Sequence, residues 1–127
     1  MSLSISAIGM MLALSQTAAT HLSVQPWTGS ELQTSSAAAA KYRLKVTGTP
    51  DSVVHLQASG VANGWLAAFC TPKFCSPQRI EVAIPSSGES VLQFELIRES
   101  DTAPKRSGAT ISENGGASVS VPAAYRG

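Results

Sequence analysis

A repeated alternation of apolar and polar residues in short segments is the feature that most constrains this chain. The segment "KYRLKVTG" at residues 41–48 places tyrosine, leucine and valine at every second position, with a lysine or arginine between them. A period of two is typical of a strand with one buried face and one face in water. The pattern recurs in "SVVHLQASG", "GWLAAFC", "RIEVAIP", "VLQFELIRE" and "GGASVSVPA", and "HLSVQPW" is a shorter candidate.

Turn-forming residues separate these segments, and no segment has a persuasive helical period. Stretches such as "GTPD", "VANG" and "SSGES" carry the glycine, proline, asparagine and serine that favour turns. Short strands at this spacing are typical of two packed antiparallel sheets. We therefore expect an all-β protein, an Ig-like antiparallel β-sandwich of about seven short strands.

The N-terminal segment differs in character from the rest of the chain. An apolar stretch, Leu3–Leu14, is followed by small residues at the spacing that signal peptidase accepts. The letters "SLSISAI" also alternate with period two, which is compatible with an edge strand. We expect a signal peptide at residues 1–19 and one β-sandwich domain at residues 20–127. The mature chain then has no transmembrane helix, because the apolar run is shorter than the roughly 20 residues that a bilayer requires.

Charge limits the expected partners. Only 13% of the residues are charged, and the formal net charge is +1. No lysine- or arginine-rich block and no interleaving of basic and aromatic residues is present, so we do not expect nucleic acid as a partner. The remaining partner classes are another envelope protein or a glycan.

The two cysteines, Cys70 and Cys75, flank a four-residue loop between two strand candidates, "GWLAAFC" and "CSPQRIEVAI". If those strands pair, the cysteines become cross-strand neighbours at a separation that a disulfide accepts. Pro72 stands where a type I turn favours proline. We therefore predict a structural disulfide, which in turn indicates an oxidising compartment, either secreted, periplasmic or in the cell envelope.

Two other uses of the cysteines remain as alternatives. A redox thiol needs a helix N-terminus or a cation beside it, and Lys73 is the only cation in the loop. A metal site needs two further ligands, and the only histidines, His21 and His55, lie alone on separate segments. We therefore expect neither a metal nor a cofactor.

Aromatic and cationic residues are the candidates for ligand contact. Trp65 alternates with other apolar residues, which indicates burial. Trp27 lies outside any alternation and is either an exposed aromatic or a side chain packed over the end of the sandwich. The three cations Lys41, Arg43 and Lys45 form one strand face, which is either simply solvated or a contact for an acidic glycan.

Catalytic residues are not expected. The chain has no Gly-x-Ser-x-Gly motif, and no pattern brings two carboxylates together in a cleft. We therefore expect that this is not an enzyme.

The segments "AAAAKYRLKVTG", "VVHLQASGVANGWLAAF" and "RIEVAIPSSGESVLQFELI" resemble, in this order, a known group of domains. They look like the bacterial Ig-like and fibronectin-type domains of the α-galactosidase-associated (NPCBM-associated) group. The resemblance covers Gln33 to Arg98. It implies a secreted or cell-envelope accessory module, used as a spacer or an adhesion element, without catalytic residues.

The leading hypothesis is an exported, non-enzymatic structural or interaction module of a bacterial cell envelope, stapled by one disulfide. The alternative is a domain that binds carbohydrate or a cell-wall polymer through Trp27 and the strand with Lys41, Arg43 and Lys45. A third and less favoured hypothesis is an envelope thiol oxidoreductase.

Overall fold

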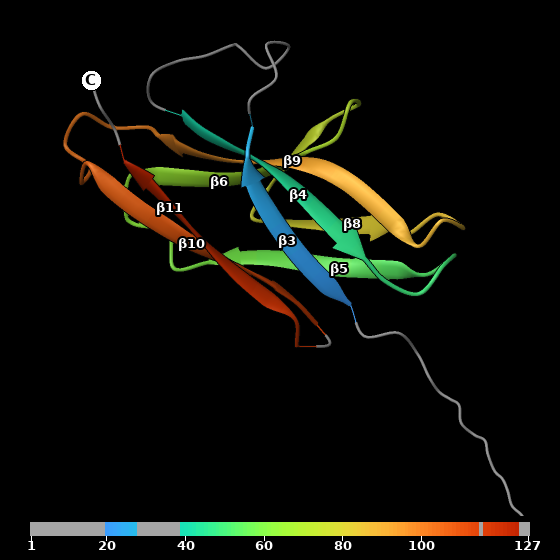
Figure 1. Cartoon of the computed structure of the whole chain (residues 1–127). Coiled ribbons are helices and arrows are strands. Elements are labelled where there is room, and N and C mark those ends of the chain that lie inside the picture. Colours follow the sequence, from blue (N-terminus) through green and yellow to red (C-terminus); the bar gives the residue numbers. More distant parts are fainter. Residues whose placement is uncertain (1–19, 28–38, 115, 125–127) are drawn as a thin grey trace, which may run out of the picture.

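The computed structural model describes residues 20–27, 39–114 and 116–124. Within these ranges the regular structure consists of strands (Figure 1). The strands are β3 (His21–Pro26), β4 (Ala39–Thr47), β5 (Val53–Ser59), β6 (Trp65–Cys70), β7 (Cys75–Pro77), β8 (Arg79–Ala83), β9 (Glu89–Arg98), β10 (Arg106–Glu113) and β11 (Ser118–Ala124). The expected signal peptide at residues 1–19 lies outside the described residues.

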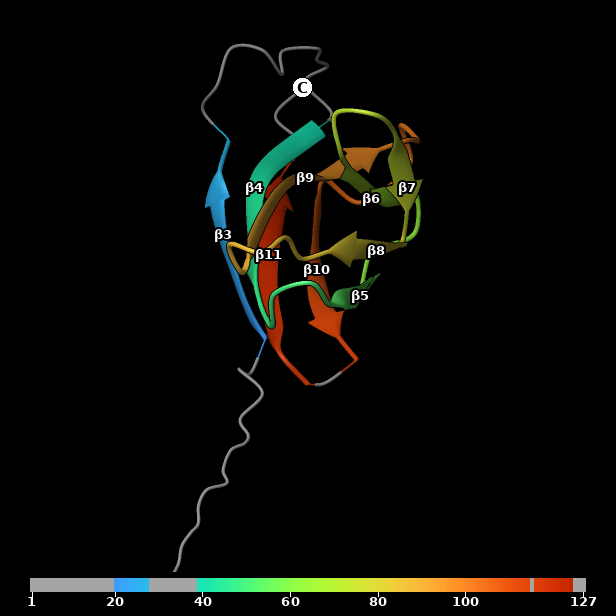
Figure 2. The same ribbon diagram turned by 90° about the vertical axis from the view of Figure 1, so that its right-hand side faces the viewer.

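The strands form two antiparallel sheets that pack face to face (Figures 1 and 2). One sheet has five strands in the order β3-β4-β9-β6-β7, and the other has four in the order β11-β10-β5-β8. The predicted all-β antiparallel sandwich is therefore confirmed. The described residues contain nine strands rather than about seven.

The neighbour relations are those of the immunoglobulin arrangement. In its lettering, β3, β4, β9 and β6 take the positions A, B, E and D, while β11, β10, β5 and β8 take G, F, C and C′. The order of the strands along the chain differs from that of an immunoglobulin domain, because β6 at position D precedes β8 at position C′. The chain crosses back to the four-stranded sheet only after β7, the short strand that follows β6.

That crossing splits one predicted strand into two. The sequence pattern treated "CSPQRIEVAI" as a single partner of "GWLAAFC", whereas β7 pairs with β6 and β8 pairs with β5 in the other sheet. Between them, Gln78 has a φ of 64°, in the left-handed region. Its N–H donates to the Ala67 carbonyl and its carbonyl accepts from the Ala58 N–H, so this one residue bonds to both sheets.

Strand β10 was missed because its inward face carries little apolar surface. Its sequence "RSGATISE" presents only Ala109 and Ile111 as buried apolar residues. Neighbouring strands define it instead, because β10 pairs with β11 on one side and with β5 on the other. Its strand character therefore depends on partners distant in sequence.

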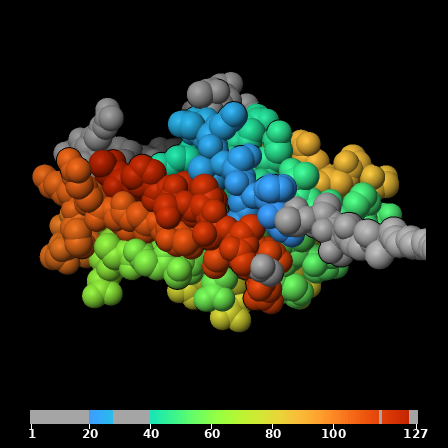
Figure 3. Space-filling model, turned by 60° about the horizontal axis from the view of Figure 1, so that its bottom comes forward, coloured from blue at the N-terminus to red at the C-terminus, as the bar shows by residue number. Residues whose placement is uncertain are grey.

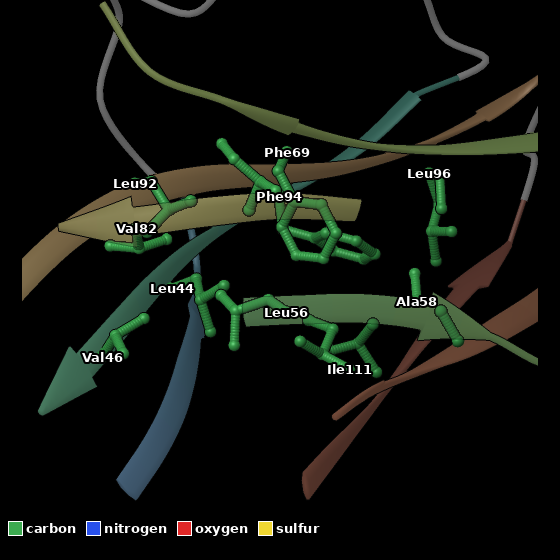
Figure 4. Close-up of a cluster of buried hydrophobic side chains, with 14 of the residues drawn as sticks. Leu44, Val46, Leu56, Ala58, Phe69, Val82, Leu92, Phe94, Leu96 and Ile111 are labelled. Atoms are coloured by element: carbon green, nitrogen blue, oxygen red, sulfur yellow. The ribbon is translucent and has the colours of Figure 1, made fainter. Parts of the chain in front are cut away.

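The core lies between the sheets and consists of apolar side chains from both (Figure 4). Phe69 and Phe94 are fully buried, and their ring centroids lie 5.0 Å apart in a tilted arrangement. Leu56 and Ile111 meet them from the four-stranded sheet. Among the described residues, no polar or charged residue is buried. Burial of this apolar surface is the main stabilising contribution to the sandwich.

Trp65 also belongs to the core, as the sequence pattern indicated. It is 7% exposed, and its Nε1 donates to the Pro104 carbonyl at 2.7 Å. This bond satisfies the one polar atom of the indole, so the burial of Trp65 leaves no donor without a partner.

Strand β3 closes one side of the sandwich. It pairs with β4 in its own sheet and also contacts β11 of the other sheet (Figure 3). Next to this junction, the Tyr42 hydroxyl of β4 donates to the Pro122 carbonyl of β11. Partial burial raises the pKa of Tyr42, so the hydroxyl keeps its proton, and hence its ability to donate, through the neutral pH range.

Gly64 precedes β6 at a close approach of two segments. Its φ is +86°, and a Cβ built there would lie 2.5 Å from the Cβ of Ala103. Gly60 has a similar φ of +76°, but a Cβ built there would meet nothing within 4 Å. The two glycines thus share the backbone conformation and differ in the space beside them.

We predict that Gly64→Ala destabilises the protein more than Gly60→Ala. The positive φ alone costs about 1–2 kcal/mol for an alanine, and the steric clash at residue 64 adds roughly 1–3 kcal/mol. Chemical denaturation of both variants and the wild type measures this difference. Equal losses of stability would contradict the close approach of Gly64 to Ala103.

Candidate functional site

The solvent side of the five-stranded sheet carries the three cations singled out in the sequence. We call this surface the five-strand face. On β4 the fully buried Leu44 and Val46 alternate with Arg43 and Lys45, which are exposed. The expected division of this strand into a core side and a solvent side is therefore confirmed, while the role of the cations as ligand contacts stays a prediction.

Trp27 lies on the same face and contacts the middle cation. Its backbone N–H donates to the Lys41 carbonyl at 3.0 Å, which extends the pairing of β3 with β4 by one residue. The guanidinium carbon of Arg43 lies 4.9 Å from the centroid of the indole ring. This distance is typical of a cation–π interaction. The indole and the cationic strand, separate in the sequence, thus form one surface.

The indole nitrogen of Trp27 is an exception to the usual satisfaction of buried polar groups. Its Nε1 is buried and has no hydrogen-bond partner within the described parts of the chain. A buried N–H without an acceptor costs about 1–3 kcal/mol. Unlike Trp65, Trp27 is therefore not held by a bond at its polar end.

A row of planar polar side chains crosses the face beside Trp27. In register, Gln25 of β3 stands opposite Arg43 of β4, Arg43 stands opposite Gln93 of β9, and Gln93 stands opposite Cys70 of β6. Two carboxamides therefore flank the guanidinium, and the row ends at the disulfide. Such groups offer several donors and acceptors in fixed planes.

Two hollows lie on this face and share Val91. The first has a volume of about 320 Å³, and its walls include Trp27, Cys70, Pro72 and Val91. The second has a volume of about 280 Å³ and a polar lining. The polar lining consists of Ser23, Gln25, Arg43, Lys45 and Glu89. We call them the apolar hollow and the polar hollow.

At the polar hollow, one of the two cations has an acidic partner. Lys45 and Glu89 lie 3.8 Å apart, with about half of each side chain exposed. Such a surface pair contributes little, because water screens both charges. Arg43 forms no ion pair with any residue in the described ranges. Its guanidinium is therefore the group most available to an anion.

Cys70 and Cys75 form the predicted disulfide, with an S–S distance of 2.04 Å. They are directly paired across β6 and β7, with Cα atoms 3.9 Å apart, which is closer than the roughly 4.5 Å typical of a non-hydrogen-bonded cross-strand pair. The loop is closed by a bond from the Thr71 N–H to the Phe74 carbonyl. Thr71 Oγ1 also accepts from the N–H groups of Lys73 and Phe74. The disulfide and this turn hold Pro72 at the wall of the apolar hollow.

Glu95 lies beside the disulfide, but the group does not form a metal centre in the oxidised protein. Ligand atoms of Cys70, Cys75 and Glu95 lie within 4.8 Å of one another. Both sulfurs are bonded to each other, whereas metal binding requires thiolates. The 3.3 Å approach of Glu95 Oε2 to Cys70 Sγ is a contact and not a hydrogen bond from sulfur, because a disulfide sulfur carries no proton.

The histidines lie on exposed positions of separate strands. His21 is on β3, and His55 is on β5 of the other sheet. His55 Nδ1 lies 3.6 Å from a Glu81 carboxylate oxygen, and both side chains are more than half exposed. They border a hollow of about 430 Å³ over β5 and β8. Water competes for both groups there, so the pair is weakly coupled.

Several residues of the five-strand face were not found from the sequence. Gln25, Val91 and Gln93 are ordinary members of strand patterns, and nothing in their local sequence distinguishes them. Only the register of β3, β4, β9 and β6 brings them next to Trp27 and Arg43.

These features define the class of protein, an Ig-like β-sandwich with a disulfide-stapled hairpin at one sheet. Neither a family model nor a curated protein matches the sequence. The resemblance to NPCBM-associated domains therefore stays a prediction.

The fold is similar to that of a solved structure, a FixG-related protein from Vibrio parahaemolyticus. The match has a TM-score of 0.51 and 14% sequence identity, and it covers 84% of this chain and 94% of that chain. At this identity, the likeness concerns the fold alone. Within the described residues, no helix has the length and apolar character needed to cross a membrane.

We predict that replacing both cysteines by alanine lowers the free energy of unfolding by about 2 kcal/mol, because the crosslink restricts only a short loop of the unfolded chain. Denaturant titration of the oxidised wild type and of Cys70→Ala/Cys75→Ala measures the difference. The reduced wild type is the control and should unfold close to the double variant. Identical midpoints for oxidised and reduced wild type would contradict the stabilising role.

Proposed function

We propose that this protein is an exported, non-enzymatic interaction module of a bacterial cell envelope, and that the five-strand face is its contact surface. The observation that carries the proposal is the meeting of Trp27, Arg43 and the disulfide hairpin around two adjoining hollows. Exposed apolar groups beside polar ones are typical of interaction sites. Val91, at the boundary of the hollows, is 43% exposed.

The disulfide supports the proposed compartment. Disulfides persist in secreted and envelope proteins, whereas cytosolic reductants keep thiols reduced. The apolar stretch in residues 1–19 and the resemblance to envelope accessory domains favour the same compartment.

The side-chain chemistry of the described faces favours binding over catalysis. Among the described residues, the histidine–carboxylate pair within ion-pair distance is His55 with Glu81, on the solvent side of the other sheet, where both side chains are more than half exposed. General acid–base catalysis depends on a group that is held within hydrogen-bond reach of the proton it transfers. A face built from amides, a guanidinium and apolar walls is better suited to hold a ligand.

We predict that the N-terminal segment directs export and that the exported protein has no titratable thiol. The full chain is fused ahead of a bacterial alkaline phosphatase, which becomes active only outside the cytoplasm. The matched control begins at residue 20 and should be inactive. Phosphatase activity from both fusions or from neither, or two thiols reacting with a maleimide in denaturant, would count against an exported, stapled module.

We predict that binding to envelope material depends on the five-strand face. The purified, oxidised protein is sedimented with cell-wall and membrane fractions, and Val91→Glu should reduce the bound amount severalfold, because it places a charge between the hollows. The matched control is Val53→Glu, since Val53 is 56% exposed on the other sheet. Equal binding by the two variants, at equal stability, would remove the five-strand face as the contact surface.

A further inference from the structure

We infer that the two hollows form one site for an acidic polysaccharide, with the carboxylate of a uronic acid at Arg43 and the C–H face of the sugar ring in the apolar hollow. This inference rests on the proposed function and names the class of ligand. It follows from four properties of the site: its division into two parts, its anion-binding group, its planar polar row and its place on the sheet.

The division of the site requires an amphipathic ligand. Val91 borders both hollows, and the pair of Trp27 and Arg43 joins them, because Trp27 lines the apolar hollow and Arg43 lines the polar one. A ligand that fills both must therefore present apolar surface on one side and polar groups on the other. A pyranose ring does this, since its C–H groups form apolar faces and its hydroxyls project around the edge.

Arg43 supplies the charge that selects an acidic ligand. It is exposed, it forms no ion pair in the described ranges, and its fork of N–H donors matches a carboxylate. Stacking on Trp27 restrains the guanidinium, which reduces the entropy lost when a ligand binds. The formal net charge of the whole chain is only +1, so charge-dependent binding has to come from a local group such as this one.

The row across the sheet supplies hydroxyl-binding groups at the sides of that charge. Gln25 and Gln93 stand next to Arg43 in register on either side. Each carboxamide has a carbonyl acceptor and an NH₂ donor, which together can bind neighbouring hydroxyls of one sugar. The spacing of paired strands, about 4.8 Å, sets the separation of these groups across the row.

The apolar hollow receives the C–H face of the ring. Its walls include Trp27, Pro72, Val91 and Cys70 of the disulfide, and Gln93 of the polar row also borders it. The buried Nε1 of Trp27 lacks an acceptor in the described residues, so an oxygen of a ligand in this hollow relieves an existing cost after a small movement of the ring. An apolar hollow with one unsatisfied donor favours a ligand rich in oxygen over a purely apolar one.

The place of the site on the sheet favours a glycan over an extended peptide. Peptides that add to a sheet bind at an edge, where backbone groups are unpaired. The row is centred on β4 and β9, and each of these strands is paired on both sides. Binding there uses side chains alone, and the side chains present are amides, a guanidinium and apolar walls.

The test uses the full, oxidised protein and two polymers with the same backbone, polygalacturonate and its fully methyl-esterified form. Calorimetry should give binding to polygalacturonate that weakens with salt and is about tenfold or more tighter than binding to the ester, because esterification removes the partner of Arg43. Arg43→Gln should reduce binding to polygalacturonate by a similar factor. Trp27→Phe, which keeps a ring but removes the N–H, should reduce binding to both polymers.

Arg79→Gln is the matched control, because Arg79 is an exposed arginine on β8 of the other sheet, and it should bind like the wild type. Equal affinity for both polymers, or equal losses from Arg43→Gln and Arg79→Gln, would overturn the acidic-glycan site. Binding to neither polymer, with envelope binding still sensitive to Val91→Glu, would also overturn it and indicate a protein partner, while the proposed function would stand. If neither polymer binds and envelope binding is also insensitive to Val91→Glu, the proposed function is overturned as well.

Discussion

The packing of two apolar sheet faces is the constraint on which the rest of this structure depends. Phe69 and Phe94 meet at the centre of the core, and the buried leucines, isoleucines and valines of both sheets surround them. Because side chains alternate along a strand, every residue committed to this core places its neighbours on the solvent side. The five-strand face is therefore a consequence of the core. A slip of one residue in β4 would bury Arg43 and Lys45 and expose Leu44, which the loss of apolar burial forbids.

Gln78 and the disulfide hold the chain in place where it leaves the edge of the five-stranded sheet. The chain leaves β6 by a tight loop, pairs for only three residues in β7, and then crosses to the other sheet. So short a strand contributes few hydrogen bonds between strands. The crosslink between Cys70 and Cys75 therefore provides a second attachment of β7 to β6. The hairpin thereby becomes a firm wall beside the hollow that contains Pro72.

The sequence was most informative where local pattern and tertiary environment agree. Alternation in β4 predicted both its strand and the solvent side of its cations, and the loop between the cysteines predicted their pairing. The sequence did not predict features that depend on pairing with strands distant along the chain. Strand β10 is defined by β5 and β11, and the break at Gln78 follows from bonds to both sheets. The row of Gln25, Arg43 and Gln93 joins three strands, and their register has no local signal.

The parts of the candidate site are held with unequal strength, and this difference has a consequence for binding. Arg43, Gln93 and Val91 occupy central strands whose register the core determines, and the disulfide holds the opposite wall. Trp27 lies beyond the end of β3, where one backbone hydrogen bond and the stack with Arg43 position it, while its Nε1 has no acceptor in the described residues. The indole is thus the side chain best able to adjust to a ligand. A site with a rigid floor and one adjustable aromatic wall suits a polymer of repeating units, because successive sugars present similar but not identical faces to the same wall.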